Sequence, residues 1–110
     1  ACEAYSRALD ALSQVSLSQQ VADRYPAMLS GGEQQRVSIA RAFCSDNRIL
    51  LADEPTGNLD TENSIAIFKL LASLAHDKGY CVVLVTHEND LASKTDDILE
   101  LCDGKIKGHL

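Results

Sequence analysis

The sequence predicts an α/β fold whose core is a parallel sheet. Two apolar runs, residues 49–52 and 80–86, have the length and composition of buried strands. Between them, apolar residues recur at helical spacing from about residue 60 to 78, and Gly79 ends the pattern. Strands that alternate with helices are typical of α/β proteins, in which helical crossovers connect parallel strands.

Further helices are expected before the first strand. Residues 1–25 are predicted to be largely helical, with a polar turn at residues 16–20 and with apolar residues at helical spacing: Ala4, Ala8, Leu12 and Val15. A helix is also predicted from Gly31 to about residue 43, and its buried side is expected to hold Val37, Ala40 and either Phe43 or Cys44.

The second half of the chain completes the predicted fold. The helix over residues 60–78, with Asp60 or Thr61 as its cap, should bury a stripe that consists of Ile67, Leu70, Leu71, Leu74 and Ala75. A short helix is expected near residues 89–94. Residues 98–102 and 105–107 flank Asp103-Gly104, and this dipeptide between two short runs predicts a β-hairpin.

The composition excludes several classes of protein. The chain has 110 residues, of which 45% are hydrophobic and 24% charged, as in an ordinary globular domain. Its net charge of −6 argues against a nucleic-acid-binding surface. The longest apolar run, residues 81–85, is too short to span a bilayer, so any membrane link should come through a partner.

The cysteines are expected to be structural. None of the four is in C-x-x-C spacing, and three of them lie in or beside apolar segments, namely Cys44, Cys81 and Cys102. Together with Cys2 they are interpreted as reduced thiols, largely buried, because neither a zinc site nor a set of disulfides fits this spacing.

The start of the helix at Gly31 has the properties of an anion-binding site. Ser30 lies where an N-cap is expected, and Glu33 follows at capping-box spacing. Gly31 and Gly32 remove side chains from the first turn, so a ligand could approach backbone N–H groups closely. A helix N-terminus favours anions such as phosphate. The alternative is an ordinary cap with a flexible entry loop.

Two carboxylates follow the first strand directly. Asp53 and Glu54 stand at its carboxyl end, where open α/β sheets bind ligands. Because adjacent strand residues point to opposite sides, one carboxylate could help to hold Mg²⁺ while the other faces an attacking water. The alternative is a solvated acidic loop.

One histidine differs from the other two. His87 leaves the second strand at the same sheet edge as Asp53 and Glu54, whereas His76 is expected on the surface near a helix C-terminus. His109 carries no functional signal. A lone histidine in the position of His87 is more often structural than catalytic, and its pattern alone leaves both roles open.

These motifs, in this order, resemble the C-terminal part of an ABC-transporter nucleotide-binding domain. Residues 29–33 (Leu-Ser-Gly-Gly-Glu) resemble its signature motif, and residues 49–54 resemble its Walker B strand. Residues 58–60 (Asn-Leu-Asp) resemble the D-loop, residues 83–88 the strand with the switch histidine, and residues 103–106 a hairpin near the sheet end. The implied fold is a partial P-loop NTPase-type parallel sheet with part of the ABC helical subdomain.

The resemblance implies ATP hydrolysis with Mg²⁺ by in-line attack of water on the γ-phosphate. Asp53 would help to hold Mg²⁺, Glu54 would be the general base, and His87 would contact the γ-phosphate. Asp60 would link two sites across a dimer. The signature of one subunit would cover ATP held by the other, so the expected trans contacts are Ser30, Gly31, Gly32 and Gln34.

The resemblance also implies an organisation and partners. Residues 1–45 would form part of the helical subdomain, and residues 46–110 the C-terminal part of the ATPase core. The expected partners are a second nucleotide-binding subunit, giving a homodimer, and an integral-membrane permease, but no nucleic acid. The chain would be cytoplasmic and peripheral on the inner face of the membrane. Residues 52–60 are similar to a subgroup that serves lipoprotein release, macrolide and peptide export, and a cell-division complex.

Two departures from the family pattern affect these expectations. Glu33 stands where the family usually has Gln, although this subgroup tolerates Glu. No G-x-x-x-x-G-K-[ST] phosphate loop occurs, since Gly104-Lys105 is the only Gly-Lys pair and lacks the upstream glycine. We therefore expect that the chain is a fragment and that it is inactive in isolation.

Two other functions stay open at this point. One is a soluble ABC-type ATPase of DNA repair or chromosome maintenance; the acidic balance and the absence of coiled-coil heptads near the signature count against it. The other is a non-catalytic dimerisation fragment that retains a dimer-facing half without its own nucleotide site.

Overall fold

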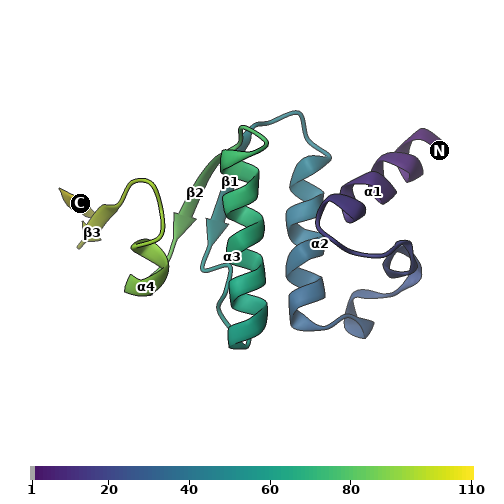
Figure 1. The fold of residues 1–110 in the computed structure, drawn as a ribbon, viewed down its shortest axis with the longest axis horizontal. Helices are drawn as coiled ribbons and strands as arrows, with labels where there is room; N and C mark the ends of the chain where they lie inside the picture. Colours follow the sequence, from purple (N-terminus) through teal and green to yellow (C-terminus); the bar gives the residue numbers. More distant parts are fainter. Residues whose placement is uncertain (1) are drawn as a thin grey trace.

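The computed structural model describes residues 2–110, apart from the side chains of Cys2 and Phe43. The chain is elongated, with extents of 48 × 29 × 24 Å, and α1 and the C-terminal hairpin lie at opposite ends (Figure 1). The elements are α1 (Cys2–Gln14), η1 (Gln19–Asp23), η2 (Pro26–Met28), α2 (Gly31–Phe43), β1 (Ile49–Asp53), α3 (Thr61–His76), β2 (Cys81–Val85), α4 (Asn89–Ala92), β3 (Leu99–Cys102) and β4 (Lys105–His109).

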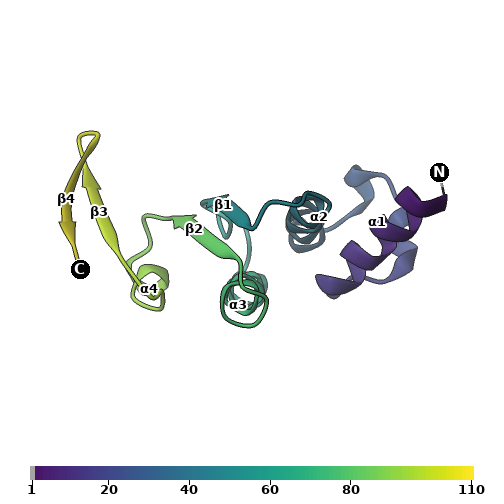
Figure 2. The ribbon, with the colours of Figure 1, turned by 90° about the horizontal axis from the view of Figure 1, so that it is seen from above.

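The predicted parallel pair is present. β1 and β2 pair in parallel from Ile49 opposite Cys81 to Asp53 opposite Val85. α3 connects them and covers one face of the pair, and α2 lies beside it (Figure 2). The α/β class and the parallel sheet are therefore confirmed.

The prediction that both strands are buried on two faces was wrong. Ile49 and Leu51 are 64% and 75% exposed, and Val83 and Val85 on the paired strand are 45% and 51% exposed. These side chains share one face, because alternate residues point the same way and the register aligns the strands. α3 covers only the opposite face, where Leu50 is buried.

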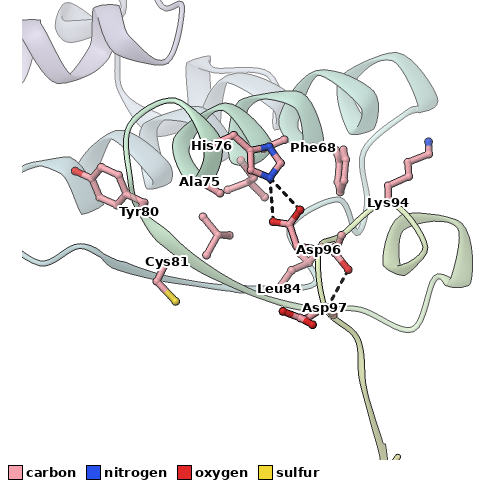
Figure 3. A pocket seen from close by; sticks show the side chains of 13 residues that line it. Phe68, Ala75, His76, Tyr80, Cys81, Leu84, Lys94, Asp96 and Asp97 are labelled. Carbon is pink, nitrogen blue, oxygen red and sulfur yellow. Dashed lines mark hydrogen bonds and ion pairs between the residues drawn. The ribbon is translucent and has the colours of Figure 1, made fainter. Parts of the chain in front are cut away.

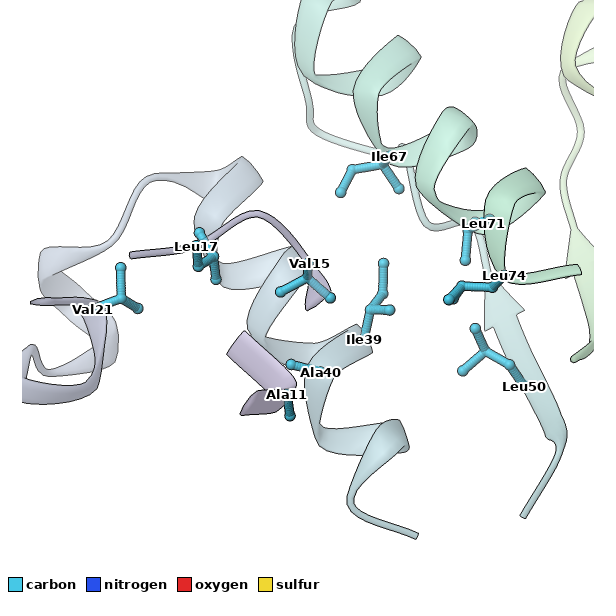
Figure 4. Close-up of a cluster of buried hydrophobic side chains, with 10 residues drawn as sticks. All are labelled: Ala11, Val15, Leu17, Val21, Ile39, Ala40, Leu50, Ile67, Leu71 and Leu74. Carbon is cyan, nitrogen blue, oxygen red and sulfur yellow. The ribbon is translucent and has the colours of Figure 1, made fainter. Parts of the chain in front are cut away.

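One hydrophobic core joins the N-terminal helices to the sheet (Figure 4). Its centre is Ile39 of α2, which lies between Val15 after α1 and Ile67 of α3. The buried cluster consists of Ala11, Val15, Leu17, Val21, Ile39, Ala40, Leu50, Ile67, Leu71 and Leu74. α2 is thus the middle layer that couples α1 to the β1–β2 sheet.

The N-terminal region departs from its prediction. α1 ends at Gln14, and Ser16 has a φ of 63°, a left-handed conformation that an α-helix does not continue through. Residues 19–23 form a 3₁₀-helix instead of an α-helix. Ala4 and Ala8 are exposed, whereas Ala11 and Val15 are buried, because α1 packs on α2 near the C-terminal end of α1. Ala1 lies outside the described residues.

The cysteine prediction was also wrong in part. Cys44, Cys81 and Cys102 are free thiols, but all three are exposed. Cys81 is exposed because it shares the uncovered face of the sheet with Val83. The expectation that either Phe43 or Cys44 is buried fails for Cys44, and the Phe43 side chain lies outside the described part of the structure.

Several local predictions were accurate. α2 begins at Gly31, and α3 is capped by Asp60, whose side chain accepts a hydrogen bond from the Asn63 N–H at 3.0 Å. Ile67, Leu71 and Leu74 of the predicted stripe are buried. β3 and β4 pair antiparallel around Asp103 and Gly104, whose φ angles of 51° and 75° match the two left-handed positions of a type I′ turn.

Gly32 is required by packing between two helix N-termini. A Cβ at this position would lie 2.5 Å from Asn63 Oδ1 and 2.8 Å from its Cγ. A Cβ at Gly31 would approach only the end of the Leu59 side chain, at 3.3 Å. The start of α2 therefore sits directly against the start of α3, and a side chain at position 32 would require the Asn63 side chain to move.

We predict that Gly32→Ala destabilises the chain by about 1–3 kcal/mol, the usual cost of overpacking. Gly31→Ala is the matched control and should have a much smaller effect. Urea unfolding of both variants measures this difference. Asn63→Ala should relieve part of the cost of Gly32→Ala, since it removes the clashing atoms. Equal stability of the two glycine variants would contradict the packing argument.

We also predict that the chain associates in solution. The sheet has two strands in the described residues, so each strand has one unpaired edge beside an exposed apolar face. Such edges recruit further strands. Sedimentation velocity over a concentration series should therefore show dimers or larger species. Val83→Lys, which places a charge on this face, should reduce association; a monomer at every concentration would contradict the prediction.

Candidate functional site

The end of β1 turns sharply at Glu54. The Glu54 N–H donates a hydrogen bond to the Val85 carbonyl at 2.8 Å, which extends the β1–β2 ladder by one step. Glu54 has a φ of 46°, and its carbonyl accepts a hydrogen bond from the Gly57 N–H at 3.0 Å. A left-handed glutamate is uncommon, and such conformations persist where the surroundings fix them, often at functional sites.

The turn brings Glu54 against His87. Glu54 Oε1 accepts a hydrogen bond from the His87 N–H at 3.0 Å and lies 2.7 Å from His87 Nδ1. The two residues are 33 positions apart in the sequence, so only the parallel pairing brings them together. Of the residues predicted at the sheet edge, Glu54 and His87 thus form one unit.

The contact changes the chemistry of the histidine. The hydrogen bond with Glu54 raises the pKa of His87, as do the negative charges of Glu54 and Glu88. The His87 side chain is nevertheless 84% exposed, so its other edge faces solvent. A protonated imidazole held in this way could donate to an anion.

Glu54 retains an unused acceptor. Its Oε2 is shielded from solvent and accepts no hydrogen bond within the described residues. A fixed carboxylate oxygen with free acceptor capacity is suited to orient a water and to take its proton.

A second contact joins the same two loops. Thr56 is 4% exposed, and its hydroxyl donates to Glu88 Oε1 at 3.4 Å. The Glu88 N–H in turn donates to Thr86 Oγ1 at 3.0 Å. None of the sequence motifs singles out Thr56. Its position could have indicated a role: Thr56 follows Glu54 by two residues and Glu88 directly follows His87, so both lie close to the pair.

Asp53 is the candidate magnesium ligand. Its side chain is exposed at the end of β1. Within residues 2–110, no group of three or more His, Cys, Asp or Glu side chains could hold a metal by itself. Mg²⁺ in phosphate-transfer sites commonly takes one or two carboxylates, with water and phosphate oxygens completing the octahedron. A single carboxylate at this edge fits that kind of site.

The loop before α2 is held by its own side chains. The predicted capping box is present: the Glu33 N–H donates to Ser30 Oγ at 3.1 Å, and the Ser30 N–H donates to Glu33 Oε1 at 3.0 Å. That backbone hydrogen bond lowers the pKa of Glu33. Gln34 Nε2 donates to the carbonyls of Pro26, at 2.8 Å, and Leu29, at 3.3 Å.

The loop before α2 contacts a different part of the site from the one that contains the Glu54–His87 pair. Gly31 and Gly32 lie against Leu59 and Asn63, beside the Asp60 cap of α3, rather than against Glu54 or His87. Ser30, Gly31, Gly32, Gln34 and Asp60 therefore form one local unit, and Glu54 and His87 form another.

A family model described as ABC transporter matches residues 3–57, which is half of the chain. The chain belongs to the ABC transporter family. It is 46% identical over 101 residues to the uncharacterised ABC transporter ATP-binding protein YclH of Bacillus subtilis and 47% identical over 105 residues to the lipoprotein-releasing system ATP-binding protein LolD of Francisella tularensis. These matches cover 92% and 96% of this chain and 45% of each relative. The chain thus spans somewhat less than half the length of these relatives.

A solved structure agrees with this assignment. A dimeric structure of the ATP-binding cassette MJ0796 bound to ADP and Pi superposes with a TM-score of 0.80 at 40% identity, over 96% of this chain and 45% of that one. The ABC fold predicted from the motifs is therefore confirmed. Within residues 2–110, no helix of this ABC chain is both long enough and apolar enough to cross a membrane.

The ABC chain has a groove away from the Glu54–His87 pair. A groove of about 400 Å³ lies between α3, β2 and the segment after α4 (Figure 3). His76 Nε2 and Asp96 point toward one another across it, 2.9 Å apart. His76 is exposed, as predicted, and His109 pairs with Asp97 at 3.1 Å. Both histidines thus have local salt-bridge partners.

We predict that Glu54→Gln lowers the pKa of His87 toward its ordinary value, because Glu54 is the main cause of its increase. A raised folded-state pKa means that the pair stabilises the fold fully below the ordinary histidine pKa. This stabilisation is lost as the pH rises through the higher folded-state value. Ring NMR signals followed over pH measure the pKa of His87, and urea unfolding at each pH measures the stabilisation.

Asp97→Asn is the control for that experiment, since it removes the charge beside His109 and should leave the His87 titration unchanged. A His87 titration that is the same in Glu54→Gln and in the unmodified chain would contradict the contact seen in the structure.

Proposed function

We propose that this chain is part of the ATP-hydrolysing subunit of an ABC transporter and that it supplies the general base and the γ-phosphate contact. The observation that carries the proposal is the Glu54–His87 pair at the carboxyl end of the β1–β2 sheet. Family membership favours this chemistry, because the relatives it matches are named as ATP-binding proteins.

In the proposed reaction, Glu54 orients the attacking water through its shielded Oε2 and takes its proton. His87 is held by the same carboxylate through Oε1 and presents its exposed edge to the γ-phosphate. Asp53 would hold Mg²⁺ beside them, and the cation would neutralise charge that develops on the phosphate oxygens.

The unit at the start of α2 is proposed to act across a dimer. Ser30 and Gly31 are exposed on a helix N-terminus, where backbone N–H groups and the helix dipole favour a phosphate. Gln34 holds the loop in shape through the Pro26 and Leu29 carbonyls, and buried Gly32 lets α2 approach α3 closely. Asp60, beside this unit, would link it to the second site.

The proposed partners are a second nucleotide-binding subunit and an integral-membrane permease on the inner face of the cell membrane. The MJ0796 cassette is described as dimeric, which favours a homodimer. LolD belongs to a lipoprotein-releasing system, and MacB of Chlorobium luteolum, 48% identical over 99 residues, is a macrolide export ATP-binding/permease protein. Export or lipoprotein extraction is therefore the proposed class of transport.

A chimera with a relative tests the proposed roles. This chain would replace the matching residues of Francisella LolD, which supplies the remainder of an ATP-binding protein. We expect the chimera to hydrolyse ATP and Glu54→Gln to reduce the rate by roughly 10²–10⁴-fold, the usual contribution of a positioned base, with ATP binding retained. Phosphate release measures turnover, and calorimetric titration measures binding.

The controls separate loss of chemistry from loss of fold. His87→Gln should also reduce turnover, whereas His109→Gln, at a histidine paired only with Asp97, should not. Near-normal hydrolysis by Glu54→Gln in an active chimera would reject Glu54 as the base. An unmodified chimera that folds and binds ATP but does not turn it over would argue against the proposed function as a whole.

A further inference from the structure

We propose that Thr56 and Glu88 are positioning residues: their hydrogen bond fixes the loop after β1 against the loop after β2 and thereby holds the Glu54–His87 pair in contact. We call this hydrogen bond the brace. The inference rests on the proposed function only where it calls the pair catalytic; the brace itself is a property of the structure.

The brace has a distinctive place among the contacts between these loops. The other hydrogen bonds between the loops use Glu54 itself, through its N–H to Val85 and through its carboxylate to His87. Within the described residues, Thr56–Glu88 is the side-chain hydrogen bond between the loops that involves neither member of the pair. It can therefore set the loop geometry without taking part in the reaction.

The burial of Thr56 favours formation of the brace. Thr56 is the one buried polar side chain in the described part of the chain, at 4% exposure. A buried hydroxyl without a partner is destabilising, so the loop geometry that supplies an acceptor is favoured. Glu88 is exposed and would stay solvated without Thr56. Removing the hydroxyl should thus release the loops without leaving an unpaired buried charge.

The two residues of the brace lie next to the pair in the sequence, so the brace can fix the distance between Glu54 and His87. Thr56 follows Glu54 by two residues, and Glu88 directly follows His87. Glu88 is itself fixed by its N–H donating to Thr86 Oγ1 at 3.0 Å. A shift of either loop would separate Glu54 Oε1 from His87, whose N–H and Nδ1 both lie within 3.0 Å of it. The groups that face His87 are Glu54 and Glu88, so the ring reports on both loops.

The test uses the unmodified 110-residue chain and needs no nucleotide. The ¹⁵N shifts and titration of the His87 ring are compared with those of Thr56→Val, which removes the hydroxyl at nearly constant shape, and of Thr56→Ser, which restores it. We expect Thr56→Val to move the His87 Nδ1 shift and to lower its pKa, and Thr56→Ser to return both. Thr95→Val, which removes a hydroxyl bonded to the Ala92 carbonyl at 2.7 Å, should leave His87 unchanged.

The other two histidines are internal references. His76 and His109 have their own carboxylate partners, Asp96 and Asp97, and their ring ¹⁵N shifts should be the same in the unmodified chain and in Thr56→Val. An unchanged His87 in Thr56→Val would overturn the proposal. Equal changes at all three histidines would also overturn it, because they would report general loosening of the fold.

A pair of variants at Glu88 keeps the test decisive if Thr56→Val fails to fold. Glu88→Gln removes the charge but keeps an acceptor, whereas Glu88→Ala removes both. We expect Glu88→Ala to perturb the His87 signals more than Glu88→Gln does, and identical effects would show that only charge matters and would reject the brace. Since none of these measurements uses ATP, an inactive LolD chimera would not affect their outcome, and failure of the brace would leave the hydrolysis experiment intact.

Discussion

The in-register parallel pairing of β1 and β2 is the constraint on which the rest of the structure depends. Because Asp53 lies opposite Val85, both strands end at the same level, and the Glu54 N–H can donate to the Val85 carbonyl. Beyond the strand ends, Glu54, directly after β1, then meets His87, two residues after β2. A slip of one residue would turn the Leu50 face outward and separate the pair, so burial of one sheet face also fixes the site.

The packing of α2 and α3 on this sheet places the second group of proposed functional residues, at the starts of the two helices. α3 covers the buried face of the sheet and begins beside the start of α2, with Gly32 against Asn63. The capping box of α2 and the Asp60 cap of α3 are therefore neighbours because their helices pack closely. The proposed trans contacts and the proposed dimer link thus lie together where α2 and α3 begin, and the core around Ile39 joins this region to the sheet.

The two side chains of the Glu54–His87 pair differ in exposure. Glu54 Oε2 is shielded from solvent, while the His87 side chain is 84% exposed. A shielded carboxylate keeps its orientation and its acceptor capacity, and an exposed imidazole with a raised pKa can reach an incoming anion. A single carboxylate oxygen, Oε1, holds both the backbone and the ring of His87 and leaves Oε2 without a hydrogen bond in the described residues, as the proposed general base requires.

The sequence alone determined the local elements: the capping box at Ser30 and Glu33, the Asp60 cap, the type I′ turn at Asp103 and Gly104, and the residues at the sheet edge. These depend on neighbours within a few positions, which sequence patterns record directly. Only the tertiary structure decided that the face with Leu51 and Val83 is exposed, that Cys81 is exposed with it, that Gly32 is a packing residue, and that Thr56 reaches Glu88. Each of these depends on what lies across a sheet face or on a second loop, and an apolar strand reads the same whether one face or both are covered.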